Sequence, residues 1–92
     1  MPNILVQGMT ENPIAFQWAK YTLSAGANKT TLTLTSSLGW AAFADTAWAG
    51  FVNMRTAGTS GYIESVGATT CLLVHSTNCT SEVDVFGIGR KA

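Results

Sequence analysis

Four short runs between residues 50 and 88 alternate apolar and polar side chains, and this alternation restricts the possible folds more than any other feature of the chain. The runs cover residues 50–56, 61–66, 69–75 and 82–88, and short Gly-, Ser-, Thr- and Asn-containing joints separate them. Alternation with a period of two residues is typical of half-buried strands, and such joints are typical of tight turns. We therefore expect four successive antiparallel strands.

The first half of the chain predicts further strands. In residues 29–36 threonine alternates with leucine, which is the pattern of a strand that buries one face and exposes the other. Between residues 14 and 23, the apolar side chains lie on one face up to Trp18 and on the opposite face from Tyr21 onward. A β-bulge near residues 19–20 would explain this change of phase.

Residues 38–52 allow two interpretations. Aromatic and alanine side chains recur there at helical spacing, namely Trp40, Phe43, Ala44, Ala47, Trp48 and Phe51. This pattern predicts a helix of two or three turns near residues 40–48. The flanking Gly39 and Gly50 fit a loop with one helical turn equally well. In both interpretations the two tryptophans are expected to be core or interface anchors.

These patterns together predict an all-β fold, an antiparallel β-sandwich or barrel of six to eight short strands, with one short helix near residues 40–48 in the helical interpretation. We expect residues 1–13 to form an extended N-terminal arm, residues 14–89 a single β domain and residues 90–92 a C-terminal tail. The apolar patch of the arm, Ile4, Leu5 and Val6, is expected to add a strand to this domain or to a neighbour.

The composition points to an assembly. Only 11% of the residues are charged and 47% are hydrophobic, and the formal net charge is zero. Proteins with almost no net charge tend to associate, so we expect part of the surface to be covered by a partner. The few basic residues are scattered and balanced by acidic ones, which argues against nucleic-acid binding. No apolar run suggests a membrane span or a secretory signal, so we expect synthesis in a cytosol.

Cys71, His75 and Cys79 are spaced by four residues and could share one face with a nearby carboxylate as a fourth zinc ligand. The turn expected at residues 76–78 interrupts that face. In a hairpin around Asn78, the two cysteines would also not lie opposite each other, as a disulfide requires. We therefore expect two free thiols and no metal or cofactor.

Catalytic residues are not expected. His75 could form a triad only with Asp45 or Asp84, and the chain has no Gly-x-Ser-x-Gly motif. Glu82 and Asp84 share one strand face but are expected to form a solvated edge, because acid–base catalysis requires one carboxyl group with a raised pKa in a cleft.

The last run is apolar on both faces toward its end. Val83 and Val85 share one face, while Asp84, Phe86 and Ile88 share the other. This pattern indicates either a bulge before Phe86 or an apolar patch that faces a partner, and we favour the partner.

The segment 50–64, followed by the closing run Val83-Asp84-Val85-Phe86-Gly87-Ile88-Gly89-Arg90, resembles the second half of small β-sandwich or barrel proteins of tailed bacteriophage virions. Head decoration (cement) proteins and small head or tail accessory proteins are the types in question. The resemblance rests on low charge, Thr-rich strands, short turns and a last strand near the C-terminus. It implies a virion protein that forms trimers or rings on the capsid.

We therefore expect a non-enzymatic structural protein of a virus particle, a decoration protein that binds the major capsid protein or another virion protein and stabilises the lattice as a homo-oligomer, with a trimer as the expected number. The expected interface residues are Ile4, Leu5, Val6, Trp40, Trp48, Phe86 and Ile88. The alternative is a glycan-binding or fibre-type attachment module that uses Trp40, Trp48 or Tyr62 as a stacking platform. A small zinc protein centred on Cys71, His75 and Cys79 is the third possibility.

Overall fold

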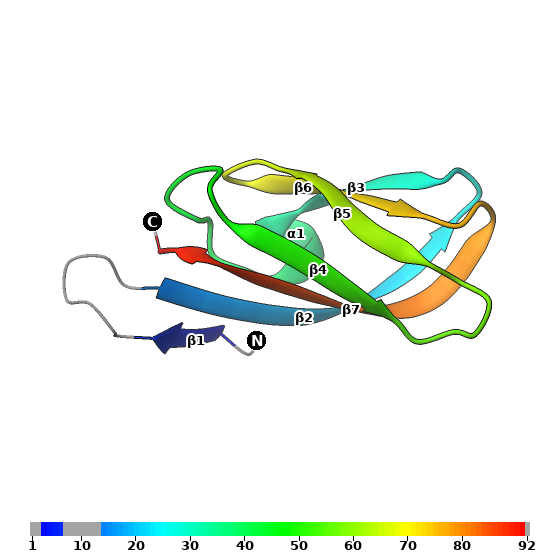
Figure 1. Cartoon of the computed structure of the whole chain (residues 1–92), viewed down its shortest axis with the longest axis horizontal. Coiled ribbons are helices and arrows are strands. Elements are labelled where there is room, and N and C mark those ends of the chain that lie inside the picture. Colours follow the sequence, from blue (N-terminus) through cyan, green and yellow to red (C-terminus); the bar gives the residue numbers. More distant parts are fainter. Residues whose placement is uncertain (1–2, 7–13, 92) are drawn as a thin grey trace.

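The described part of the chain forms seven strands and one short helix, arranged as two antiparallel sheets (Figure 1). This computed structural model describes residues 3–6 and 14–91. The elements are β1 (Asn3–Val6), β2 (Ile14–Ala25), β3 (Lys29–Thr33), α1 (Leu34–Leu38), β4 (Ala49–Met54), β5 (Gly61–Val66), β6 (Thr70–His75) and β7 (Cys79–Arg90). The all-β sandwich expected from the sequence is confirmed.

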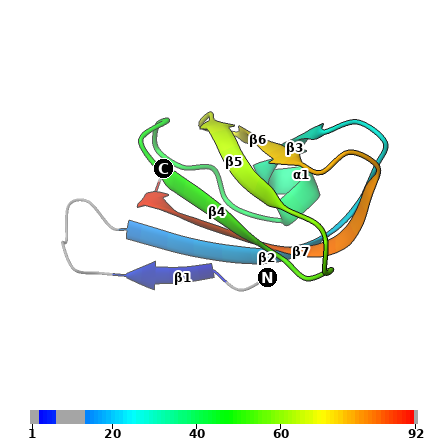
Figure 2. The same cartoon turned by 45° about the vertical axis from the view of Figure 1, so that its right-hand side comes forward.

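The larger sheet has the strand order β1-β2-β7-β4 and the smaller sheet the order β3-β6-β5. Figures 1 and 2 show the two sheets as separate layers with α1 between them. The long strands β2 and β7 are paired along their whole length, from Ile14 opposite Arg90 to Ala25 opposite Cys79. This ladder is the base on which β1 and β4 form the two edges.

The core lies between the two layers. Leu23, Val83 and Val85 enter it from the larger sheet and Leu32 and Leu73 from the smaller one, and all are at most 1% exposed. Burial of one such side chain contributes about 1.5–3 kcal/mol. In β6, the middle strand of the smaller sheet, fully buried residues alternate with half-buried ones, as expected for a central strand.

The helix lies earlier in the chain than the helical interpretation of residues 38–52 placed it. The expected strand 29–36 ends at Thr33, and α1 follows directly. Leu34 and Leu38 are one helical turn apart, so both point into the core. Gly39 then adopts a left-handed conformation with φ 69°, and its N–H donates to the Thr35 carbonyl at 3.1 Å. This glycine ends the helix after five residues.

Residues 40–48, for which the sequence allowed either a helix or a loop with one helical turn, are irregular. The helical spacing of their aromatic residues reflects a compact cluster instead. The Phe43 and Trp48 rings are stacked with centroids 4.7 Å apart, and the Trp40 ring meets both edge-on. The buried Gln17 of β2 fixes this loop, because its side-chain amide accepts from Ala41 N–H at 2.8 Å and donates to Ala41 C=O at 3.0 Å.

The aromatic cluster, defined as Trp40, Phe43 and Trp48, occupies space that side chains of β7 would otherwise fill. A Cβ atom added to Gly87 would lie 2.7 Å from Trp40 Cζ3, and one added to Gly89 would lie 2.3 Å from Trp48 Cβ. Real Cβ atoms almost never approach other atoms so closely. The glycines of β7 therefore let the loop pack directly on the strand backbone.

The two ends of the chain extend the larger sheet. Residues 3–6 of the expected arm form β1, which pairs with β2 of the same chain, while residues 1–2 and 7–13 lie outside the described residues. Strand β7 continues to Arg90, and Lys91 forms a β-bridge with Phe43. The segment expected as a C-terminal tail thus begins inside the sheet, and residue 92 is not described.

Gly87→Ala should destabilise the domain, because the new methyl group would overlap with two indole rings in a filled core. We expect a loss of about 1–3 kcal/mol in unfolding free energy, measured by urea titration. Gly26→Ala is the matched control, since the nearest atom would lie at an ordinary 3.6 Å. Equal stability of the two variants would contradict the role assigned to Gly87.

Candidate interaction surface

The outer face of the larger sheet divides into two halves of opposite character. The first, which we name the apolar half, consists of Ile14, Phe16, Trp18, Phe51, Phe86 and Ile88. The register places Trp18, Phe86 and Phe51 opposite one another on three neighbouring strands, with Phe16 opposite Ile88 one step further along. Phe51 is 51% exposed and Ile88 42% exposed, so the surface of this half is open to solvent.

Three phenylalanine rings form a continuous stack across this half. The Phe86 ring lies in the middle, with centroids 5.1 Å from Phe51 and 6.4 Å from Phe16. The interplanar angles are 12° and 14°, so the three rings are nearly parallel. Rings from β4, β7 and β2 therefore cover the sheet with an ordered aromatic layer rather than with scattered apolar side chains.

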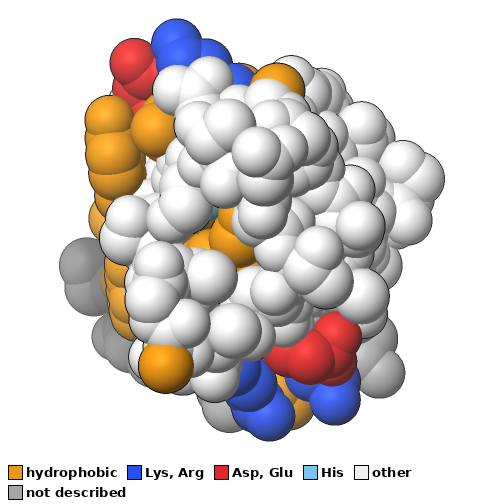
Figure 3. All heavy atoms as spheres, turned by 90° about the vertical axis from the view of Figure 1, so that its right-hand side faces the viewer, with side chains coloured by type: hydrophobic (Ala, Val, Ile, Leu, Met, Phe, Trp, Pro, Cys, Tyr) orange, Lys and Arg blue, Asp and Glu red, His pale blue; other side chains and the backbone are white. Residues whose placement is uncertain are grey.

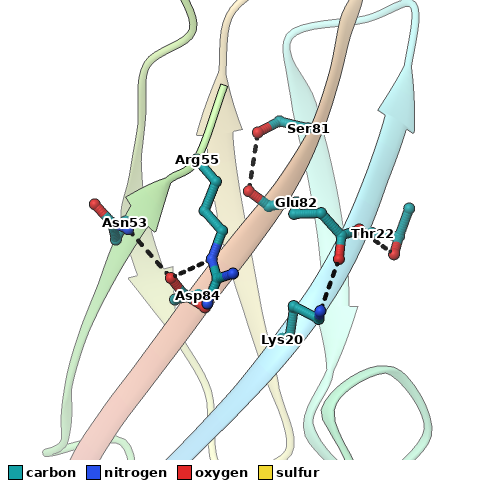
Figure 4. Close-up of polar contacts among 7 residues, drawn as sticks. All are labelled: Lys20, Thr22, Asn53, Arg55, Ser81, Glu82 and Asp84. Carbon is teal, nitrogen blue, oxygen red and sulfur yellow. Dashed lines mark hydrogen bonds and ion pairs between the residues drawn. The ribbon is translucent and has the colours of Figure 1, made fainter. Parts of the chain in front are cut away.

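The second, charged half consists of Lys20, Thr22, Asn53, Arg55, Glu82 and Asp84 (Figure 4). Arg55 binds Asp84 with two hydrogen bonds of 2.8 Å, from Nε to Oδ2 and from Nη2 to Oδ1. Asn53 donates to the same carboxylate at 3.1 Å. Glu82 accepts from the Thr22 hydroxyl at 2.6 Å and lies 3.3 Å from Lys20 Nζ.

These contacts stabilise the ionised carboxylates. Hydrogen bonds from Arg55, and then from Asn53, lower the pKa of Asp84, and a weaker one from Trp18 acts in the same direction. Thr22 and Lys20 lower the pKa of Glu82. The hydrogen bonds to Asp84 raise the pKa of Arg55. Each charge of this half is thus held by a partner on a neighbouring strand.

The two halves correspond to the change of face that the sequence of β2 shows between Trp18 and Tyr21. The cause of this change is not the bulge that we expected. The β2–β7 ladder runs without a register shift, so the expected bulge near residues 19–20 is absent. Instead, β2 turns its large apolar side chains outward up to Trp18 and inward from Ala19 onward. Strand β7 changes in the opposite order, with Val85 inward and Phe86 outward.

The aromatic cluster explains this exchange of faces. Where it covers the inner side of the sheet, the inward positions carry small residues or an amide, namely Ala15, Gln17, Gly50, Gly87 and Gly89. The inner face has no room there for large side chains. The large apolar residues of the same strands therefore lie outside.

The structure brings together only some of the expected interface residues. Phe86 and Ile88 lie in the apolar half, as part of an unbulged strand. Trp40 and Trp48 are 2% and 7% exposed in the core, which corrects their expected role as partner contacts. The choice between core and interface was open because an isolated tryptophan fits either environment.

The remaining expected residues, Ile4, Leu5 and Val6, belong to β1, where Ile4 is in register with Phe16. The structure does not describe their side chains, so their contact with a partner stays a prediction. Sequence reasoning missed Phe16, Trp18 and Phe51 as members of the surface. Phe51 could have been found from its parity, because it shares a face with Asn53 and Arg55.

The side chains considered for metal binding, His75, Cys71 and Cys79, are all buried within the domain. His75 is buried, with Nδ1 donating to Ser76 C=O at 2.8 Å and Nε2 2.8 Å from the Thr30 hydroxyl. Cys71 and Cys79 are buried free thiols, and desolvation raises the pKa of Cys71 to about 11. Among the described residues no three His, Cys, Asp or Glu side chains converge as a metal site.

Asp84 also differs from its expected environment. It is 6% exposed and held by Arg55 and Asn53, so it is not part of a solvated edge. Its lowered pKa is the opposite of what a general acid needs.

The end of the sandwich that carries the β2–β3, β4–β5 and β6–β7 connections is mainly polar but uncharged, with charged side chains in two groups at opposite edges (Figure 3). Tyr62 on β5 is 58% exposed. It is the largest exposed fraction among the big apolar side chains of the described residues.

Two solved structures share this fold. The C-terminal part of the R2 pyocin fibre of P. aeruginosa matches with a TM-score of 0.65 and 16% identity, covering 98% of this chain and 26% of that one. An N-truncated R2-type pyocin tail fibre matches with a TM-score of 0.64 and 16% identity, covering 98% of this chain and 38% of that one. The chain therefore spans well under half of either fibre fragment.

No protein-family model and no curated protein sequence matches the chain. In the described part of the chain, no helix has the length and apolar character that a membrane crossing requires.

Acid should weaken the fold through the charged half. Because Glu82 and Asp84 have lowered pKa values in the folded state, the stabilisation is present above the ordinary carboxyl pKa of about 4 and is lost as the pH falls through the folded-state values. Urea titrations at decreasing pH should show this loss.

Asp84→Asn should be less stable near neutral pH and should show a shallower loss in acid. Glu64→Gln is the control, since it removes a carboxylate of the other sheet that lies 3.7 Å from Lys29 Nζ, and it should retain the wild-type fall. An undiminished fall in Asp84→Asn would contradict the role of this residue.

Proposed function

We propose that this domain is a non-enzymatic structural module of a phage-tail-type fibre. The observation that carries the proposal is the fold similarity, which extends over 98% of the chain in both pyocin fibre structures. Because the chain corresponds to only 26% or 38% of those fragments, the proposal concerns one module and not a whole fibre. A virion location follows from the same proposal.

The surface chemistry supports a structural role. Exposed aromatic and aliphatic side chains cover half of one sheet face, which is typical of contact surfaces in assemblies. The residues with catalytic potential have structural partners instead, as His75 and Asp84 show. The low content of charge, 11% of the residues, suits a domain that is partly covered by neighbours.

The fold similarity favours the fibre-type alternative over the decoration protein that the sequence suggested first. Both matching structures are fibre fragments, whereas the resemblance to decoration proteins rests on composition and turn style. We therefore place the module in the tail rather than on the head in this proposal.

The copy number in the purified particle tests this placement. Quantitative mass spectrometry should count a handful of copies of the chain, and gold-labelled antibodies should bind at the tail in electron micrographs. Hundreds of copies with label over the head would overturn the proposal in favour of a decoration protein.

A glycan-binding role is the second candidate. Of the three aromatic side chains considered for stacking on a glycan, only Tyr62 is exposed. Trp40 and Trp48 are buried, while Tyr62 exposes 58% of its surface on the smaller sheet. If the module binds glycans by ring stacking, Tyr62→Ala should abolish the binding seen on a glycan array, whereas Phe51→Ala on the other sheet should retain it. An array without any bound glycan would dismiss this candidate.

A further inference from the structure

We draw no further inference here: the strongest candidate, the apolar half of the larger sheet around Phe51, Phe86 and Ile88, is an exposed sheet face, and nothing among the described residues shows what covers it.

Discussion

The packing of an irregular loop onto the backbone of β7 is the constraint on which the rest of the structure depends. Trp40, Phe43 and Trp48 form one cluster, and Gly87 and Gly89 supply the space that it fills. A side chain at Gly87 would displace an indole ring, and one at Gly89 would overlap with Trp48 Cβ. Large residues were thereby excluded from one end of the inner face, and a loop of ten residues without regular structure became part of the core.

The two halves of the outer face follow from this packing. Where the cluster lies inside, β2 and β7 carry their apolar side chains outside, and the stacked phenylalanines result. Where Leu23, Val83 and Val85 lie inside, the outer positions carry ion pairs. The same strands thus contribute to the core at one end and to a contact surface at the other. The β2–β7 ladder runs without a register shift, and this allows the two strands to play both roles.

Much of this fold could be predicted from the alternation of residues, and the rest could not for identifiable reasons. The strands expected at 50–56, 61–66, 69–75 and 82–88 are present as β4, β5, β6 and the longer β7, because in each strand one face is less exposed than the other. The helix was not located because loop residues 40–48 mimic helical spacing, while Leu34 was assigned to the strand 29–36 and Leu38 to the ambiguous stretch 38–52. Phe16 and Trp18 were missed as surface residues because the change of face after Trp18 was attributed to a β-bulge and not to apolar side chains that point outward.

The positions of the two buried thiols have a consequence for measuring how this sandwich opens. Cys71 belongs to the smaller sheet and Cys79 begins the last strand of the larger one, and neither forms a disulfide. A thiol reagent can reach each sulfur only when its own layer separates from the core. Equal labelling rates would therefore indicate that the layers part in one cooperative event, and unequal rates would show that one sheet frays while the other remains closed.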